Sequence, residues 1–282
     1  MRFPLRRAAT NAVAAFVTLF FFAPSAPGRD VGMKAEMLGE YEPRTYEDGK
    51  GNSLPYRLLV PKVNTDGTKD SWARLPLILF LHGAGERGSD NKAQLKWGGS
   101  LLAGDVQRQE PTFVVAPQCP QGKQWVNTPW GKGSYSTEKV PISDELRMAL
   151  EIVEQVKKDF PVDPDRVYVM GLSMGGYGSW DAVARRPELF AAAVPICGGG
   201  DPSRAEAIAK NKVGVWAFHG GADNVVPPQG SRDMVEAMKR AGAEPKYAEY
   251  PDVGHDSWVK AWNEPELVEW LFAQERGGSD RK

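Results

Sequence analysis

The sequence predicts an α/β protein: a mostly parallel, twisted sheet of about eight strands, with helices on both faces and an antiparallel hairpin at the N-terminal end. Two observations lead to this prediction. Apolar runs such as Leu75–Leu81 contain almost no polar residue, which is typical of a parallel strand buried on both faces. After this run, further apolar segments alternate with segments of helical character, the pattern of a parallel sheet flanked by helices.

The first two expected strands, Gly39–Tyr46 and Leu54–Val60, are separated by a turn rich in Gly, Asp and Asn and form the hairpin. The other strands are expected at Leu75–Leu81, Thr112–Pro117, Arg166–Leu172, Leu189–Ile196, Val213–Phe218 and Pro245–Tyr250. Helices are expected at Asn91–Leu102, Ser143–Phe160, Gly176–Arg185, Ser203–Asn211, Ser231–Ala241 and Pro265–Gln274. The 143–160 helix is the clearest, because its apolar residues recur on one face and Ser143 can cap its first turn.

Length and composition favour one globular domain, which we expect over residues 29–276, with a disordered tail at 277–282. The 282 residues are 41% hydrophobic and 25% charged, an ordinary composition that provides for one sizeable core. The net charge is −1 and no block of like charges occurs. We therefore expect no nucleic-acid partner and no attraction to an anionic membrane.

The N-terminus has the pattern of a secretory signal peptide over residues 1–28. Arg2, Arg6 and Arg7 precede the apolar run Ala12–Ala23, which is followed by small residues and prolines. This run is shorter than the roughly 20 residues that span a bilayer. The pattern predicts a secreted or periplasmic protein without stable membrane association after cleavage; an uncleaved anchor is the alternative.

A candidate nucleophile lies where an expected strand meets an expected helix. Residues 171–175 read Gly-Leu-Ser-Met-Gly, a G-x-S-x-G pattern, and the strand–turn–helix context around them is the one that this pattern requires. A serine on such a turn projects beyond the sheet edge, and the flanking glycines avoid steric clashes. Ser173 is therefore the candidate nucleophile; a glycine-rich turn without catalytic function is the alternative.

Four segments far apart in the sequence are expected to meet beside this serine. Ser173, Asp223, His255 and the His82–Gly88 loop each follow a strand, and ligands bind beyond the carboxyl ends of the strands in such sheets. A serine hydroxyl needs a base, and that base needs an orienting carboxylate. The order Ser…Asp…His predicts His255 as the base, whereas His82 and His219 precede glycines at strand ends, where an imidazole usually braces the turn.

Asp223 is the expected orienting acid. It follows the 213–218 strand, and the next strand, 245–250, leads to His255. An aspartate that bonds its own turn is the alternative interpretation. Asp201 and Asp252 are rival acids, although Asp252 is only three residues before His255 and so too close to reach the ring from behind.

The negative charge of an acyl-transfer intermediate requires preorganised donors. The backbone N–H of Met174, at the start of a helix, is one candidate. The second is expected from the loop after the 75–81 strand, from Ala84 or Gly85. A plain tight turn is the alternative for this loop.

Tryptophans mark a possible binding cleft. Trp125 and Trp130 lie in the long aperiodic segment Gln118–Pro141, and Trp258 follows His255. They could line an apolar or sugar-binding cleft, or only hold the loops in place. We expect no metal and no organic cofactor, because no His, Cys and Asp residues have ligand spacing.

From Gly39 to Ala273 the chain resembles the α/β-hydrolases of the group that holds the prolyl oligopeptidase-like peptidases and the secreted feruloyl and acetylxylan esterases. The residues that carry the resemblance are Leu81–Gly88, Ala116–Pro120, Gly171–Gly176, His219–Pro227 and Gly254–His255. It implies a serine carboxylic-ester hydrolase acting through an acyl-enzyme on a small-molecule or carbohydrate-linked ester. A serine peptidase of the same group is the alternative, and a non-catalytic binding module with this fold is a further one.

The resemblance also implies a strand order in which two strands separate the one before Cys119 from the one before Cys197. Three steps of about 4.8 Å give about 14 Å, against a Cα–Cα limit of about 7 Å for a disulfide. Both cysteines are therefore expected to be free.

Overall fold

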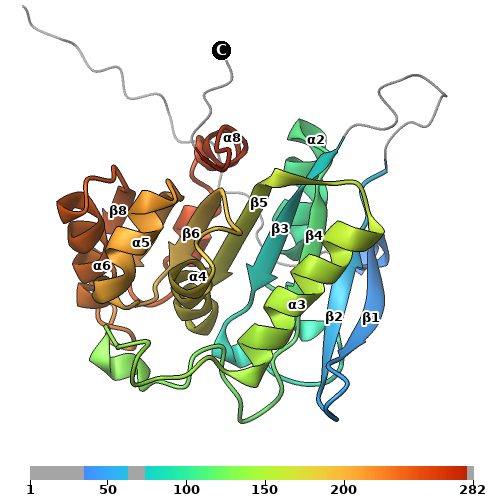
Figure 1. The fold of residues 1–282 in the computed structure, drawn as a ribbon, viewed down its shortest axis with the longest axis horizontal. Helices are drawn as coiled ribbons and strands as arrows, with labels where there is room; N and C mark the ends of the chain where they lie inside the picture. Colours follow the sequence, from blue (N-terminus) through green and yellow to red (C-terminus); the bar gives the residue numbers. More distant parts are fainter. Residues whose placement is uncertain (1–34, 63–73, 278–282) are drawn as a thin grey trace, which may run out of the picture.

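A computed structural model describes residues 35–62 and 74–277 of the chain (Figure 1). The expected signal peptide at 1–28 and residues 278–282 of the expected tail lie outside the described residues. Within the described residues, none of the helices combines the length and the apolar character needed to cross a membrane.

The described residues form one eight-stranded sheet in the order β1-β2-β4-β3-β5-β6-β7-β8. The strands are β1 (Tyr41–Glu47), β2 (Ser53–Leu59), β3 (Leu75–Leu81), β4 (Phe113–Pro117), β5 (Val162–Leu172), β6 (Ala192–Ile196), β7 (Gly214–Gly220) and β8 (Lys246–Tyr250). Strand β2 is antiparallel to both β1 and β4, and all other neighbours are parallel. The predicted mixed, mostly parallel sheet with an N-terminal hairpin is thus confirmed.

Helices cover both faces of this sheet (Figure 1). One face carries α3 (Asp144–Asp159), α4 (Met174–Arg185), α5 (Ala205–Lys210) and α6 (Gln229–Arg240). The other carries α1 (Gly99–Leu101), α2 (Gln107–Gln109), α7 (Trp258–Ala261) and α8 (Leu267–Phe272). Alternate residues of the central strands point into the two cores: Leu77 and Leu79 pack on one side, Ile78 and Phe80 on the other.

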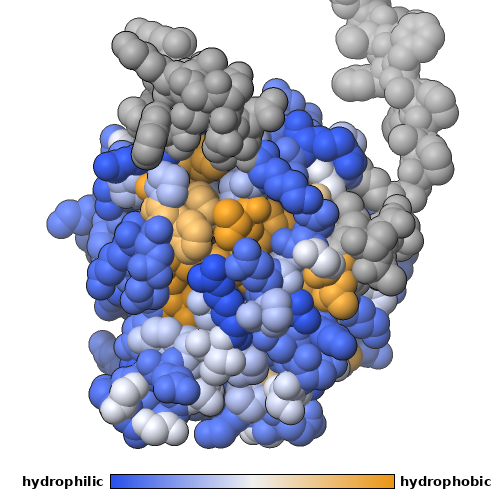
Figure 2. Space-filling model, turned by 90° about the vertical axis from the view of Figure 1, so that its right-hand side faces the viewer, coloured by the Kyte–Doolittle hydropathy of each residue, from blue (hydrophilic) through white to orange (hydrophobic). Residues whose placement is uncertain are grey.

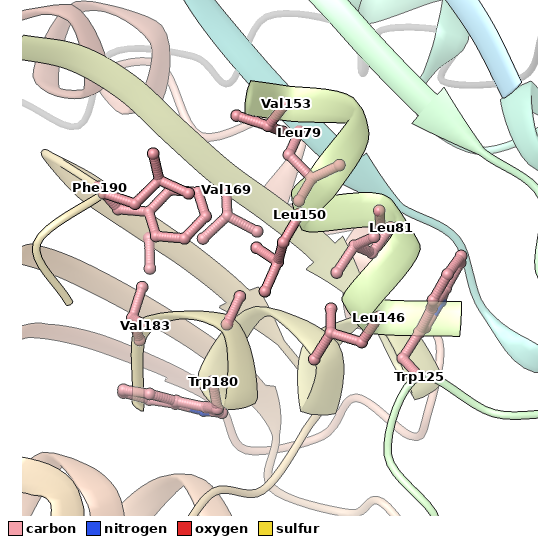
Figure 3. Close-up of a cluster of buried hydrophobic side chains, with 14 of the residues drawn as sticks. Leu79, Leu81, Trp125, Leu146, Leu150, Val153, Val169, Trp180, Val183 and Phe190 are labelled. Atoms are coloured by element: carbon pink, nitrogen blue, oxygen red, sulfur yellow. The ribbon is translucent and has the colours of Figure 1, made fainter. Parts of the chain in front are cut away.

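Helix α3 shows how sequence pattern becomes core packing. Ser143 precedes it as the predicted cap, and its hydroxyl oxygen accepts a hydrogen bond from the Leu146 N–H at 3.0 Å. Leu150 lies beside Val169 of the sheet and Leu146 near Leu81, all within one core (Figure 3). The apolar face of the helix is thus turned to the sheet, as its amphipathic periodicity predicts.

The short helix expected around Asn91–Leu102 is only partly present and is not continuous. The segment contains a 3-10 turn at Ala93–Leu95 and the short α1, which runs into a π-helical turn at Leu102–Val106. Gly98 packs directly against the ring of Phe80, where a Cβ would lie 2.5 Å from the ring Cζ atom. Close contact with the sheet therefore replaces a continuous helix here.

The two cysteines are buried and free, as expected. Strands β3 and β5 separate β4, which precedes Cys119, from β6, which precedes Cys197.

The side of the molecule formed by β1 and β2 is hydrophilic around a narrower hydrophobic region (Figure 2). Among the described residues, the exposed large hydrophobic side chains are Val225 and Val259. Val225 lies in the loop after β7 and Val259 in α7, which follows the loop after β8, so both lie beyond the carboxyl ends of parallel strands, where the candidate site lies.

Candidate active site

Ser173 occupies a strained turn between β5 and α4. Its backbone has φ 54° and ψ −116°, and its N–H donates to the Ile196 carbonyl of the neighbouring strand at 2.8 Å. The two flanking glycines allow this turn to pack against the sheet. A Cβ at Gly175 would lie 1.9 Å from the Leu81 carbonyl oxygen, and one at Gly171 would lie 2.3 Å from the Gly175 carbonyl oxygen.

Three side chains from three loops form one hydrogen-bonded chain. Ser173 Oγ lies 2.8 Å from His255 Nε2, and His255 Nδ1 lies 2.7 Å from Asp223 Oδ2. The serine and aspartate are buried, whereas the histidine side chain is 21% exposed. Since the carboxylate only accepts, Nδ1 carries the proton and Nε2 is free to accept one from the serine hydroxyl.

The environment of Asp223 keeps its carboxylate ionised. Burial alone would raise its pKa, but hydrogen bonds from His219, His255 and the N–H groups of Val226 and Val225 hold the pKa well below the usual range. Both backbone donors reach Oδ1 at 2.9 Å. An anion fixed in this way can orient an imidazole and stabilise its protonated form.

The other two histidines brace turns rather than contacting the serine. His82 Nδ1 lies 2.6 Å from the Gly83 carbonyl oxygen, and its Nε2 accepts from the Cys119 N–H at 2.9 Å. Burial lowers the pKa of His82 to about 4, so this ring is neutral at neutral pH. His219 is completely buried and contacts Ser231.

The rival acids do not reach His255. Asp201 accepts hydrogen bonds from Thr137 and Ser203, which tie the 134–142 segment to the end of β6. Asp252 is exposed in the loop after β8. Of the three candidate acids, only Asp223 is hydrogen-bonded to the imidazole.

Two sets of backbone donors flank Ser173. Met174 begins α4, and the first N–H groups of a helix have no acceptor within it. Ala84 and Gly85 open a 3-10 turn in which the later N–H groups of Glu86 and Arg87 are already bonded. Ala84 and Gly85 also line the same cavity as the serine, so both stay candidates for the second oxyanion donor.

A mainly apolar cavity of about 300 Å³ opens beside Ser173 and His255. Its walls are formed by Gly83, Ala84, Gly85, Glu86, Trp97, Trp130, Leu172, Val225 and Trp258. Trp130 and Trp258 thus lie where a cleft was predicted. A larger hollow of about 720 Å³ lies over α3, but none of the three hydrogen-bonded residues lines it.

Trp125 does not line this cavity, which corrects the prediction for that residue. Its side chain is fully buried, and its Nε1–H donates to the His82 carbonyl oxygen at 3.1 Å. Its ring also packs edge-on against the His82 ring. Trp125 therefore supports the 82–88 loop from below instead of contacting a ligand.

The sequence pattern missed two residues of the cavity wall, Trp97 and Glu86. Trp97 lies in the turn that interrupts the helix expected at 91–102, and its Nε1–H donates to Glu86 Oε1 at 3.1 Å. Burial raises the pKa of Glu86. Glu86 is the only acidic residue of the 82–88 motif, and this was the only sequence feature that could have indicated its place in the cavity wall.

Cys197 Sγ lies with Asp223 and His255 in a cluster whose candidate ligand atoms are within 4.8 Å of one another. The carboxylate of Asp223 already receives N–H donors on both oxygens, so hydrogen bonding accounts for its position. This donor set does not fit a metal without breaking the contact between Asp223 and His255.

Comparison with known proteins decides the family. Residues 120–263, just over half of the chain, match the model of the dienelactone hydrolase family. The chain belongs to the dienelactone hydrolase family. The matched region of this dienelactone hydrolase family member contains Ser173, Asp223 and His255, and the expected resemblance to the α/β-hydrolase esterases is confirmed.

Several known proteins are similar to this family member. The crystal structure of a thermostable esterase superimposes with a TM-score of 0.74 at 36% identity, covering 86% of this chain and 64% of that one. A secreted protein of Arthroderma benhamiae, itself without an assigned activity, is 23% identical over 73% of this chain and 24% of its own length. The bifunctional acetylxylan esterase/xylanase XynS20E of Neocallimastix patriciarum is 26% identical over 54% of this chain and 20% of its own.

The chain therefore spans a quarter or less of the length of these two curated relatives. The family and these esterase relatives make the chain similar to carboxylesterase-like hydrolases.

Proposed function

We propose that this protein is an exported serine hydrolase that cleaves carboxylic esters through an acyl-enzyme. The observation that carries the proposal is the chain of hydrogen bonds from Ser173 through His255 to Asp223, at 2.8 and 2.7 Å, beside an apolar cavity. This geometry is the one by which a base and an orienting acid activate a serine.

In the proposed reaction, Ser173 Oγ attacks the ester carbonyl while His255 Nε2 takes its proton. The resulting oxyanion is stabilised by the N–H of Met174 and by that of Ala84 or Gly85. The tetrahedral intermediate expels the alcohol, which receives the proton from His255. Water, deprotonated by the same imidazole, then attacks the acyl-enzyme, and release of the carboxylic acid regenerates the free serine.

The cavity favours a compact, uncharged acyl or alcohol group. Aromatic walls from Trp97, Trp130 and Trp258 offer flat apolar surfaces suited to a ring or a sugar face. No Lys or Arg is among the described residues that line it, whereas the carboxyl of Glu86 is. An anionic substrate group would be disfavoured beside this carboxyl. Acetyl or feruloyl esters of carbohydrates are uncharged and fit this description.

Export and domain organisation are part of the proposal. Residues 1–28 would be a signal peptide, residues 29–276 one α/β-hydrolase domain and residues 277–282 a disordered tail. The basic and apolar pattern of the N-terminus supports export, as does the relative described as a secreted protein.

Hydrolysis of short-chain p-nitrophenyl esters by the protein without residues 1–28 tests the proposal. We expect turnover by the wild type and a loss of several orders of magnitude in Ser173→Ala. Ser179→Ala is the matched control, because its hydroxyl lies in the same helix and bonds only the Gly175 carbonyl among the described contacts.

Feruloyl esters, acetylated sugars and peptide amides run in parallel would define the substrate. Cleavage of amides but not of esters would replace the proposal with the peptidase alternative. Equal inertness of the wild type and Ser173→Ala on every substrate would instead indicate a binding module.

A further inference from the structure

The carboxylate of Asp223 has a second imidazole neighbour. His219, near the end of β7, is completely buried. Its Nε2 lies 3.0 Å from the Val226 carbonyl oxygen and 3.3 Å from Asp223 Oδ2. Both oxygens can only accept hydrogen bonds. An unprotonated Nε2 would therefore face two acceptors with no proton between them. Nε2 of His219 must therefore carry a proton.

The opposite ring nitrogen does not change this conclusion. His219 Nδ1 lies 2.8 Å from Ser231 Oγ of α6, and the same hydroxyl lies 2.9 Å from the Gly198 carbonyl oxygen. The Ser231 hydroxyl has one proton to donate. If it donates to Nδ1, the ring is neutral; if it donates to the Gly198 carbonyl, Nδ1 must itself carry a proton, and the ring is then doubly protonated. In both cases the proton on Nε2 stays directed at Val226 and Asp223.

We propose that His219 is a positioning residue that fixes the carboxylate of Asp223 for the histidine of the catalytic triad, an inference that rests on the proposed function. Oδ1 of Asp223 is held by the two N–H groups of Val225 and Val226, and Oδ2 is shared by the two imidazoles. Three hydrogen bonds and the 3.3 Å contact with His219 Nε2 together hold the carboxylate facing His255.

Apart from the Val226 carbonyl, which shares the Nε2 proton, the described surroundings of His219 offer no second carboxylate that competes with Asp223 for it. Glu249 is the neighbour of His219 across β7 and β8, but its carboxylate is engaged by Arg232 and by the Tyr247 hydroxyl. These hydrogen bonds, that from Arg232 above all, lower the pKa of Glu249 to about 2. Ser231 supplies only a neutral hydroxyl on the α6 side.

Two near-isosteric substitutions separate the two ring nitrogens. In His219→Gln the side-chain amide nitrogen can occupy the position of Nε2 and donate to Asp223. In His219→Asn the shorter amide can reach only the position of Nδ1, beside Ser231. Because both variants replace a buried ring by an amide, a general packing defect would affect them alike.

We expect His219→Gln to keep kcat for p-nitrophenyl acetate within about 10-fold of the wild type and His219→Asn to lose about 100-fold, with KM little changed in both. Equal kcat losses in the two variants would overturn the proposal.

Imidazole ¹⁵N NMR of the wild type gives a readout that depends neither on activity nor on the variants folding. The chain has only three histidines, so three ring systems need assignment. We expect a protonated Nε2 for His219, and an unprotonated Nε2 would overturn the proposal. If the wild type hydrolyses no ester, the proposed function fails, while the protonation of His219 is still decided by this spectrum.

Discussion

Ser173 and Cys197 end neighbouring parallel strands in the same unusual way. Each has a positive φ, 54° and 40° respectively, and each donates its N–H to a carbonyl of the next strand, that of Ile196 or Phe218, at 2.8 Å. Positive φ costs an L-residue roughly 1–2 kcal/mol. Strain at these two strand ends is thus offset by hydrogen bonds, and it directs the Ser173 side chain toward His255.

The backbone strain at Ser173 should be measurable as a difference in stability between two substitutions of this residue. We expect Ser173→Gly to be more stable than Ser173→Ala by about 1 kcal/mol, because both lose the hydroxyl but only glycine adopts this φ and ψ without strain. Urea unfolding of the two variants measures the difference. A less stable Ser173→Gly would show that the turn is not strained.

Close packing of the same turn predicts a severe effect at Gly175. The added Cβ of Gly175→Ala would meet the Leu81 carbonyl oxygen at 1.9 Å, so we expect a loss of about 3 kcal/mol, or a melting temperature lower by roughly 6–12 °C. Gly131→Ala is the control, since a Cβ added there would have no atom within 4 Å and its φ is not positive. Similar melting temperatures for the two variants would contradict this packing.

The contrast between Trp130 and Trp125 tests the cavity. Trp130→Ala should lower kcat/KM for a feruloyl ester by about 10-fold, with an acetyl ester affected less, because it removes one aromatic wall. Trp125→Phe should instead lower stability by about 1–3 kcal/mol without changing this preference, because it leaves the buried His82 carbonyl oxygen unpaired. A change of preference in Trp125→Phe would place that ring in the cavity after all.

The loss of folding stability at acidic pH should depend on Asp223. Its pKa in the folded protein lies below the value of about 3.9 that an aspartate has in an unfolded chain. The stability that this carboxylate contributes is therefore complete above pH 4 and is lost as the pH falls, since the unfolded state takes up the proton first. We expect Asp223→Asn to lose less free energy of unfolding than the wild type between pH 6 and pH 3.

The same variant should lower kcat by about 10⁴-fold at neutral pH. The exposed Asp252→Asn is the control for both measurements. Equal pH dependences for the wild type and Asp223→Asn would show that the carboxylate contributes nothing to acid stability.

Sequence pattern predicted the centre of the sheet because strands such as β3 and β4 are continuous apolar runs with clear ends. Leu75–Leu81 was predicted with its observed bounds, and the 143–160 helix within one residue at each end. The helix expected at 91–102 is interrupted near Gly98, which packs on Phe80, a contact between segments that local periodicity does not reveal.

The candidate site followed from topology, because the carboxyl ends of parallel strands meet at one edge. That argument brought Ser173, Asp223 and His255 together, and the structure places them within hydrogen-bonding distance. Trp125 was wrongly predicted to line the cleft. The long 118–141 segment turns this ring inward, and its aperiodic sequence does not reveal that path. The contact of His219 with Asp223 was missed for a similar reason, since it depends on how the 220–226 turn folds back.

Covalent labelling tests the central claim, that Ser173 is the nucleophile, most directly. The signal-free protein would be treated with a fluorophosphonate, which reacts with activated serines, and the digested protein analysed by mass spectrometry. We predict one adduct, on the peptide that contains Ser173, and none in Ser173→Ala. An adduct on a different serine, or ester hydrolysis that continues in Ser173→Ala, would contradict the account.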